Sequence, residues 1–387
     1  MAVRAGSQAG VRARSMKITI VTGPSYPVPA VSGGAMSKAW ELLAPEFAAR
    51  GHEVVVLTRR HGRAAAPAPG ANPRMVATWG FAQSRSLAFD LARDLAYATS
   101  LVPKLPRADV LVCNDFWLPA IAPWLTPAAG RVFICAARQP KRQYRLYRRD
   151  PRVIALSRAV AAAIAAQEPR LGPRTAVIPL PVDLDLFRQV GPPPPRPGRV
   201  LQYVGRVHPE KGVHLLVRAF VRLAEAHPGW RLRIIGPIEA GQGGGGGAYI
   251  DELHAIAAGS LAVQFTGPVF DRAALARAYA DADLICYPSL AEHGEAFGVV
   301  PLEGMAAGVP PVVSRLACFE DFVHDGDNGW VFDHRAADPV GALADVLDLA
   351  MRDDAERRRR GALGRAQAER HSVPWVAQRY LEEFALP

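Results

Sequence analysis

Cysteine is scarce in this chain of 387 residues, which contains only four. Cys113, Cys135, Cys286 and Cys318 stand far apart and lack the close paired spacing of a zinc site. Three of them lie in or beside apolar segments, so we expect buried thiols in a reducing compartment. No cluster of metal-ligating residues is recognisable, and we predict no metal site.

Long apolar runs are missing as well. No stretch of about eighteen consecutive apolar residues occurs, so the sequence predicts no membrane-spanning helix. The first fifteen residues contain several arginines but no extended apolar core, which does not match a secretory signal. We therefore expect residues 1–15 to be a disordered extension, with either Met1 or Met16 as the true start, and we expect a cytoplasmic protein.

Acidic residues are fewer than basic ones. Aspartate and glutamate number 36 against 46 lysines and arginines, which gives a formal net charge of +10. Such a balance favours anionic partners, which include nucleic acid, an acidic membrane surface and phosphorylated ligands. An overall bias toward arginine, alanine and proline explains the charge equally well, so charge alone does not choose among these partners.

Apolar strand patterns alternate with amphipathic helical patterns along the chain. Half of the residues are hydrophobic, and the length exceeds that of one typical core. The first unit is a strand at 17–21, the glycine pair Gly33 and Gly34, a helix that Gly51 ends, and a strand at 53–57. Alternation of this kind predicts two α/β domains, each with a parallel sheet covered on both faces.

The segment from Glu292 to Ser314 carries the densest set of functional candidates. The apolar run 284–287 is a predicted buried strand. Pro301 suits a first helical turn, and Gly308 ends that helix before a second apolar strand at 311–313. Glu295 and Glu303 lie in the preceding loop and in the helix, with seven residues between them. A helix N-terminus beside glycine offers unpaired N–H groups to an anion such as a diphosphate, whereas carboxylates suit hydroxyl groups.

A second cluster follows the predicted strand at 200–204. Gly205 at the strand end allows a ligand to approach the backbone closely. Arg206 and Lys211, five residues apart, can converge on one diphosphate. Alone, Lys211 is as readily a solvated residue at the start of a helix, but its place beside the glutamate segment favours the phosphate role.

Together these two segments resemble the donor-binding elements of family-four retaining glycosyltransferases of the GT-B fold, the group of glycogen synthases and mannosyltransferases. The resemblance covers nearly the whole chain from Met16 and implies an α/β protein with two Rossmann-like domains facing across a cleft. It implies that Glu295 faces the donor sugar and that Glu303 holds the ribose hydroxyls. Arg206 and Lys211 would neutralise the leaving nucleoside diphosphate. The plainer alternative is a helix capped by acids in an ordinary α/β domain.

The same resemblance implies further donor contacts, most of them through the backbone. Each of these turns is also compatible with an ordinary helix entry or strand end. The positions are Gly205, Phe297, Gly298 and Val299 near the phosphates, Gly33 and Gly34 near the donor phosphate or the acceptor, and Pro268 and Val269 near the base.

The acceptor side departs from the family pattern. Asn114 and Asp115 follow the predicted strand at 110–113, where the family often has histidine and aspartate. Polar groups at the carboxyl edge of a parallel sheet are well placed for ligands. Asp115 either orients an acceptor hydroxyl or caps the following helix, and Arg138 is a further acceptor candidate. Pro181 stands where the family usually has glycine and should stiffen the crossover between the domains.

Basic residues gather between Lys141 and Arg149. On a helix they fall within an arc of roughly 120°. Such a face suits an acidic membrane surface, an anionic acceptor or nucleic acid, and it is equally compatible with a solvated helix face. The proline-rich segment 191–198 and the glycine run 243–247 are predicted surface loops, and the glycine run does not directly follow a strand as a dinucleotide site requires.

These observations lead to a prediction of domains and reaction. An acceptor-side domain spans 16–182, a donor-binding domain spans 183–365, and 366–387 returns as a helix to the first domain. The predicted reaction moves a hexose-type sugar from a nucleoside-diphosphate sugar to the hydroxyl of a sugar, glycolipid or small molecule, with retention. Arg206, Lys211 and the helix after Gly298 would stabilise the departing charge.

Other functions compete with this prediction. A nucleotide-sugar epimerase or a phosphorylase of the same fold uses a similar cleft, although the pair Glu295 and Glu303 favours transfer. A basic, non-catalytic binding protein would explain the charge but leaves the two donor segments unexplained. We predict no cofactor, since the sugar nucleotide is the donor substrate, and no nucleic-acid partner. Peripheral contact with the inner face of an acidic membrane is an additional predicted interaction.

Overall fold

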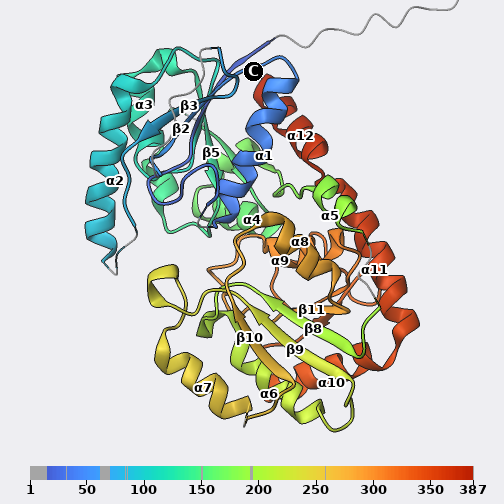
Figure 1. Ribbon diagram of the computed structural model, residues 1–387. Helices are drawn as coiled ribbons and strands as arrows, with labels where there is room; N and C mark the ends of the chain where they lie inside the picture. The colour runs from blue at the N-terminus through green and yellow to red at the C-terminus, as the bar shows by residue number, and fades with distance from the viewer. Residues whose placement is uncertain are drawn as a thin grey trace, which may run out of the picture.

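The computed structural model describes residues 15–31, 33–61, 70–82, 84, 86–149, 151–191, 195–257 and 259–386. Two parallel sheets flanked by helices form the two halves of the molecule (Figure 1). The predicted α/β class is confirmed. The expected extension 1–15 lies almost entirely outside the described residues, as do positions 192–194 of the proline-rich segment.

The first half contains a seven-stranded sheet in the order β3-β2-β1-β4-β5-β6-β7, and all of its strand pairs are parallel. Four of its helices are α1 (Ala35–Ala49), α2 (Leu87–Leu101), α3 (Leu118–Leu125) and α4 (Arg158–Gln167). The strands are β1 (Lys17–Val21), β2 (Glu53–Arg59), β3 (Arg74–Thr78), β4 (Val110–Cys113), β5 (Arg131–Ala136), β6 (Arg152–Ala155) and β7 (Thr175–Val177).

The second half contains a six-stranded parallel sheet in the order β10-β9-β8-β11-β12-β13. Its strands are β8 (Arg199–Val204), β9 (Trp230–Ile235), β10 (Val263–Gly267), β11 (Leu284–Tyr287), β12 (Pro311–Ser314) and β13 (Trp330–Phe332). Its helices are α5 (Leu184–Val190), α6 (Val213–Leu223), α7 (Gly247–Ala257), α8 (Arg272–Ala280), α9 (Val299–Ala306), α10 (Pro339–Arg352) and α11 (Asp354–Ala368).

Each sheet reverses its strand order once, and this reversal positions the site. In the second sheet β8 pairs with β9 on one side and with β11 on the other. In the first sheet β1 lies between β2 and β4. Because the connections leave such a pair of strands in opposite directions, a crevice opens at the carboxyl ends, where open α/β sheets bind ligands.

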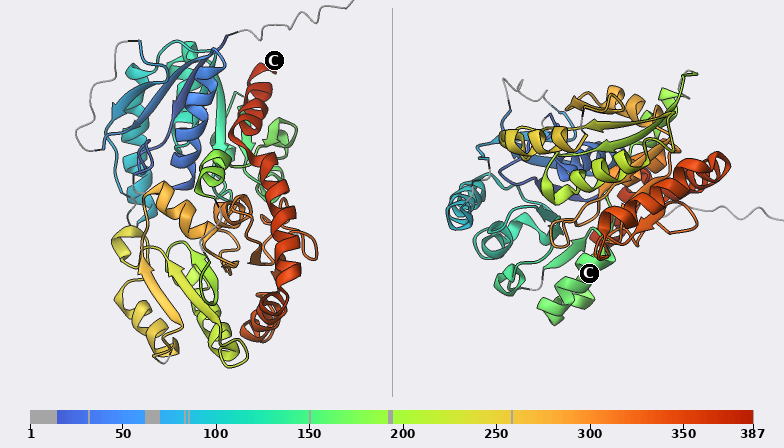
Figure 2. Two further views of the ribbon diagram at one scale, coloured as in Figure 1. Left: turned by 45° about the vertical axis from the view of Figure 1, so that its right-hand side comes forward. Right: turned by 90° about the horizontal axis from the view of Figure 1, so that it is seen from below.

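The last helix, α12 (Val373–Ala385), returns to the first half and lies beside α1 (Figure 2). Its buried rings pack edge-on against α1, with centroids 5.5 Å apart for Trp40 and Tyr380 and 6.0 Å apart for Phe47 and Phe384. Phe384 also packs against Phe133 of β5, with the two ring centroids 4.8 Å apart. The chain thus passes between the halves twice, and the boundary expected at 365/366 falls within the last turn of α11.

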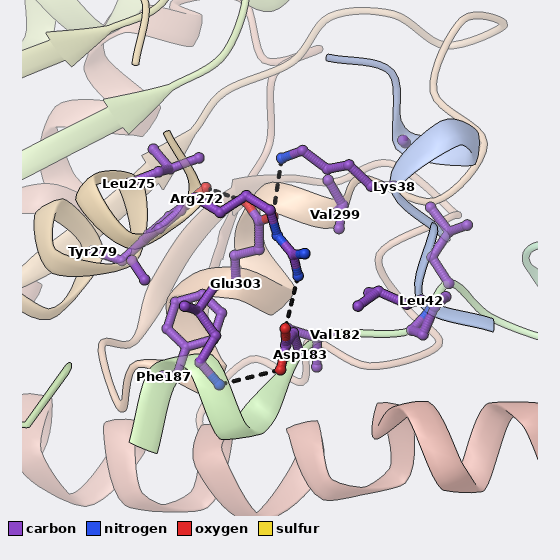
Figure 3. A pocket seen from close by; sticks show the side chains of 15 residues that line it. Lys38, Leu42, Val182, Asp183, Phe187, Arg272, Leu275, Tyr279, Val299 and Glu303 are labelled. Carbon is purple, nitrogen blue, oxygen red and sulfur yellow. Dashed lines mark hydrogen bonds and ion pairs between the residues drawn. The ribbon is translucent and has the colours of Figure 1, made fainter. Parts of the chain in front are cut away.

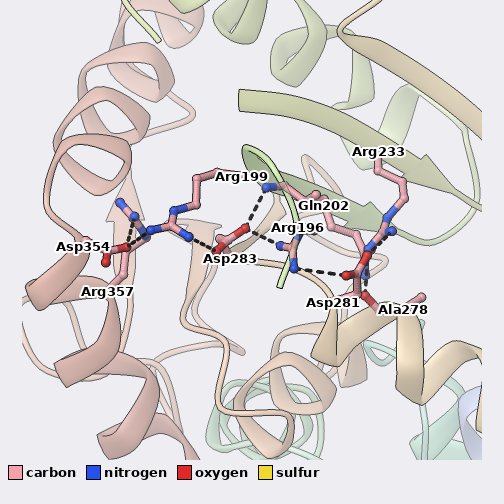
Figure 4. Close-up of polar contacts among 10 residues, drawn as sticks. Arg196, Arg199, Gln202, Arg233, Ala278, Asp281, Asp283, Asp354 and Arg357 are labelled. Atoms are coloured by element: carbon pink, nitrogen blue, oxygen red, sulfur yellow. Dashed lines mark hydrogen bonds and ion pairs between the residues drawn. The ribbon is translucent and has the colours of Figure 1, made fainter. Parts of the chain in front are cut away.

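The amino edge of the second sheet is held by a network of arginines and aspartates (Figure 4). Asp283, which precedes β11, accepts hydrogen bonds from the Arg196 guanidinium and from the Val200 N–H, the latter at 2.8 Å. Arg233 of β9 joins this edge through Asp281 at 2.7 Å. Since these charges are paired with one another at the edge away from the crevice, we assign them a structural role.

The interpretation of residues 141–149 as one helical face is wrong. Only Gln143–Leu146 forms a short 3-10 helix, and Arg142 and Arg149 take φ values of 67° and 59°. An α-helix does not accommodate such left-handed residues in its interior. Two tyrosines of this segment are buried, so burial of aromatic rings shapes it rather than a solvated basic stripe.

All four cysteines are free and buried, which confirms the expectation of buried thiols. Within the described ranges, the structure contains no helix with both the length and the apolar character needed to cross a bilayer.

Candidate active site

The site is built at the reversal of strand order in the second half, where β8 and β11 end side by side. Gly205 directly follows β8 with a φ of 144°, and a side chain there would meet the Tyr203 hydroxyl at 2.9 Å. Gly212, with a φ of 66°, begins α6 and leads its backbone against the carbonyl of Pro288, where no Cβ fits. Glycine therefore brings the loops after the two strands into close contact.

Lys211 and Glu295 meet in this crevice. The Lys211 Nζ lies 2.7 Å from the Glu295 Oε2, and the two side chains are only 8% and 10% exposed. The hydroxyls of Tyr287 and Ser289 donate to the same carboxylate oxygen at 3.1 and 3.0 Å. Burial, together with the charge of Glu295, raises the pKa of Tyr287 well above its usual range, so this phenol remains a neutral donor. The structure thus joins two of the predicted catalytic residues directly.

Arg206 is held on the same loop by different partners. Its guanidinium lies 2.5 Å from Glu210 and donates to the Gly243 carbonyl at 3.0 Å. Glu210 and Lys211 belong to one 3-10 turn, Pro209–Lys211, so Arg206 is anchored to the turn that carries the lysine. The Arg206 side chain is 43% exposed, which leaves it accessible to an anion.

The backbone before α9 forms the next part of the site. Phe297 is buried and stacks on Phe322 with ring centroids 4.9 Å apart. Gly298 takes a φ of 79°, and a Cβ there would lie 2.3 Å from the Phe319 ring. Because the Phe297 ring is buried and Gly298 has no side chain, the predicted phosphate residues Phe297, Gly298 and Val299 can offer only backbone and one small aliphatic side chain at the start of α9, where N–H groups are unpaired.

Glu303 lies one turn into α9 and faces the first half of the molecule. Its Oε2 accepts a hydrogen bond from the Tyr279 hydroxyl at 2.7 Å, and its Oε1 lies 3.4 Å from the Nζ of Lys38 on α1. A pocket between the halves is lined by α1, the crossover, α5, α8 and α9 (Figure 3). Glu303 and Val299 line this pocket, whereas the pair Lys211 and Glu295 lies outside it.

Gly33 and Gly34 lead into α1 on the cleft side. Both have positive φ values, 84° and 97°, and Gly34 is the N-cap of the helix that carries Lys38. A side chain at Gly34 would approach the Tyr26 ring within 3.2 Å, whereas Gly33 has open space around its Cα. The pair thus leads directly into the first turn of α1, whose residues Ala35 and Lys38 line the pocket with Glu303.

The acceptor candidates lie in the first half, near its own reversal of strand order. Asn114 donates to the Val21 carbonyl at 2.7 Å and accepts from the Trp40 indole N–H at 3.1 Å. Arg138 follows β5 with an exposed side chain. The contacts of Asn114 with Val21 and Trp40 place it between β1 and α1, where it supports the loop that leads to the glycine pair.

Asp115 makes the helix-capping contact that was one of its two predicted roles. Its Oδ2 accepts from the Leu118 N–H at 2.9 Å, and the residue is 8% exposed. Burial raises the pKa of Asp115 to about 8, and the neighbouring carboxylate of Asp94 adds to the rise. Asp94 in turn accepts from the N–H groups of Phe116 and Trp117, both at 3.1 Å.

Pro268 and Val269 follow β10, the outermost strand of the second sheet. Pro268 is exposed and Val269 half-buried. They are separated from β11 by two strands, β9 and β8, and their contact with the base stays a prediction.

Sequence reasoning missed four side chains of the site. Tyr287 and Ser289 end and follow the strand before the glutamate segment, so their position at the carboxyl edge was readable. Lys38 and Tyr279 carry no such local signal. Lys38 reaches Glu303 from a helix 265 positions away, and Tyr279 reaches it from the preceding helix, 24 positions away.

Both halves of the chain match known glycosyltransferases. Residues 189–367 match the family model described as Glycosyl transferases group 1. Residues 36–186 match the family model described as Glycosyltransferase Family 4. The chain belongs to this family of glycosyltransferases, which confirms the predicted resemblance.

Sequence relatives include the phosphatidyl-myo-inositol mannosyltransferase of Mycobacterium tuberculosis. It is 33% identical over 220 residues, which is 55% of this chain and 54% of that protein. A D-inositol 3-phosphate glycosyltransferase of Actinosynnema mirum is 36% identical over 151 residues, 38% of this chain and 35% of that protein. The match thus spans about half the length of the first relative and a smaller share of the second.

Solved structures share the fold over almost the entire chain. HepE of Anabaena, in complex with UDP and glucose, has a TM-score of 0.72 at 20% identity and covers 96% of this chain and 100% of its own. Sucrose-phosphate synthase from Thermosynechococcus elongatus has a TM-score of 0.73 at 20% identity, with the same coverage. The predicted GT-B fold is confirmed.

Proposed function

We propose that this protein is a retaining glycosyltransferase that moves a hexose-type sugar from a nucleoside-diphosphate sugar to an acceptor hydroxyl. The observation that carries the proposal is the contact of Lys211 with Glu295 beside the start of α9, with Glu303 one turn further on. In this proposal the donor extends from the pair Lys211 and Glu295 to the pocket that Glu303 lines, and it meets a cation for its diphosphate and two acids for its hydroxyl groups. The relatives described above are glycosyltransferases, which supports transfer over epimerisation or phosphorolysis.

Each residue has a role in this reaction. The bond between the anomeric carbon and the diphosphate oxygen breaks, the acceptor oxygen attacks from the same face, and its proton passes to the leaving phosphate. Lys211, Arg206 and the N–H groups at the start of α9 stabilise the charge that develops on that phosphate. Glu295 orients the sugar and Glu303 binds the ribose. The reaction needs no further cofactor in this proposal.

A donor panel tests the proposal. The protein is incubated with UDP-, GDP- and ADP-sugars, and release of the nucleoside diphosphate is measured with and without acceptor. Relatives named for phosphatidyl-myo-inositol and D-inositol 3-phosphate make inositol-bearing acceptors the first to try. Acceptor-dependent release from one donor supports transfer, whereas epimerised donor, phosphate-dependent cleavage or no binding of any donor would refute it.

Peripheral contact with an acidic membrane is proposed as a second property. Trp124 and Leu125 at the end of α3 are 58% and 59% exposed, and the Arg149 guanidinium lies 3.8 Å over the Trp124 ring. Exposed apolar rings beside cations suit an anionic lipid surface, and the contact would occur at the cytoplasmic face.

Liposome co-sedimentation tests the membrane proposal. Charge reversal at Arg145, Arg148 and Arg149 should reduce binding to vesicles that contain acidic lipid. Reversal of the exposed Arg222, Arg352 and Arg358 in the second half changes the net charge equally, so it is the matched control and should leave binding intact. Equal lipid binding by all three proteins rules out this surface.

A further inference from the structure

Helix α1 presents two opposite charges to the second half of the molecule. Lys38 and Glu41 are three residues apart, which places them on one face of the helix. Lys38 contacts Glu303 of α9 at 3.4 Å, and the Glu41 Oε1 lies 3.6 Å from Arg272 of α8. Arg272 also binds Asp183 at the start of α5 at 2.7 Å (Figure 3).

These pairs differ in what their partners do. Arg272 contacts Glu41 and Asp183, and none of these three residues has a role in the proposed reaction. Lys38, in contrast, occupies the carboxylate that the proposed function assigns to the ribose. The other oxygen of Glu303 accepts from Tyr279, so both oxygens already have partners in the free protein.

We propose that the contact between Lys38 and Glu303 is a latch between the two halves, and that the nucleotide ribose displaces Lys38 from Glu303 when the donor binds. This inference rests on the proposed function, because it takes Glu303 as the ribose ligand. The latch holds α1 against α9 in the free protein. Once the donor is in place, the contact is broken and the end of α1 that carries Lys38 is released from α9. Donor binding and the position of the first half are thereby coupled through one carboxylate.

The expected size of the effect follows from the exposure of the pair. The side chains of Lys38 and Glu303 are 31% and 13% exposed, so the pair is only partly shielded from water. Such ion pairs contribute little to stability. A ligand that binds only after the pair has opened has its apparent affinity reduced in proportion to the fraction of molecules in the open state. Removing the latch should therefore strengthen nucleoside-diphosphate binding by about two- to five-fold.

Titration calorimetry of Lys38→Met with UDP, GDP and ADP tests the latch. Methionine keeps the length and helix propensity of the side chain and removes the charge. The matched control is Arg158→Met, which removes another pair between the halves, Arg158 with Asp321 at 2.7 Å, without touching Glu303. We expect tighter binding by Lys38→Met and unchanged binding by Arg158→Met.

A second measurement follows Lys38 in the wild-type protein. The rate of its acetylation by a small amine-reactive reagent, read by mass spectrometry, should rise when the nucleoside diphosphate binds, because the amine is released. Slower labelling, or weaker binding by Lys38→Met, would show that Lys38 holds the nucleotide and would overturn the latch. Unchanged affinity of Lys38→Met would overturn it too, whereas failure of the wild type to bind any of the three nucleotides would refute the proposed function itself.

Discussion

Lys211 and Glu295 reach each other from loops on neighbouring strands, and each neutralises the other in a place with little access to water. Lys211→Met leaves the Glu295 carboxylate buried without its cation, so we expect the free energy of unfolding to fall by about 3 kcal/mol. The double variant with Glu295→Gln removes both charges and should recover most of that loss, while nucleoside-diphosphate binding stays impaired in both. Denaturant unfolding and titration measure this. A double variant as unstable as the single one would contradict the pairing.

Asp115 makes the stability of the folded protein depend on pH. Its raised pKa means that the folded protein holds this proton more tightly than the unfolded chain does. The stability that the group contributes is fully present below pH of about 4 and is lost as the pH rises through the raised value. Asp115→Asn keeps an acceptor for the Leu118 N–H and removes the titration.

Thermal unfolding across pH tests this account of Asp115. The melting temperature of Asp115→Asn should rise relative to wild type by a few degrees between pH of about 5 and pH of about 8. Asp185→Asn, at an aspartate that is 80% exposed, is the control and should follow the wild type. A difference between Asp115→Asn and wild type that does not change with pH would argue against a buried, protonated carboxyl.

At the scale of elements, the start of α9 depends on one glycine. Gly298→Ala places a Cβ on a backbone with positive φ and against the Phe319 ring. We expect a loss of about 1–3 kcal/mol in stability and weaker nucleoside-diphosphate binding, because the loop must shift. Gly326→Ala has the same φ of about 80° but open space, and it should lose less stability and no affinity. Equal affinity of Gly298→Ala and wild type would remove this backbone from the site.

Local patterns predicted the elements of the site well. The expected strands at 17–21, 110–113 and 284–287 coincide with β1, β4 and β11, since a buried parallel strand is a short apolar run bounded by turn residues. The helix expected at 141–149 failed because its tyrosines are drawn into the core by residues distant in the sequence, which periodicity does not reveal.

The site itself was predictable only in part. The family resemblance predicted that Glu295 and Lys211 belong to one donor site, and the structure places the two side chains in contact. The contact of Lys38 with Glu303 joins residues 265 positions apart in opposite halves. It depends on how the two sheets are oriented, and no local pattern specifies that orientation.

At the scale of the whole molecule, α12 ties the end of the chain to the first half. Phe384 is fully buried against Phe47 and Phe133. Phe384→Ala should therefore lower the free energy of unfolding by about 3–5 kcal/mol. Trp375→Ala, at a ring of the same helix that is 40% exposed, should lose much less. Similar losses in chemical denaturation would mean that α12 does not stabilise the first half by packing.

The most direct test of the central claim is a crystal structure of the protein with the nucleoside diphosphate that it binds best. We predict the diphosphate within hydrogen-bonding distance of Lys211, Arg206 and the backbone at the start of α9, with the ribose hydroxyls on Glu303. A nucleotide bound away from the crevice between β8 and β11, or a ribose turned away from Glu303, would contradict the account.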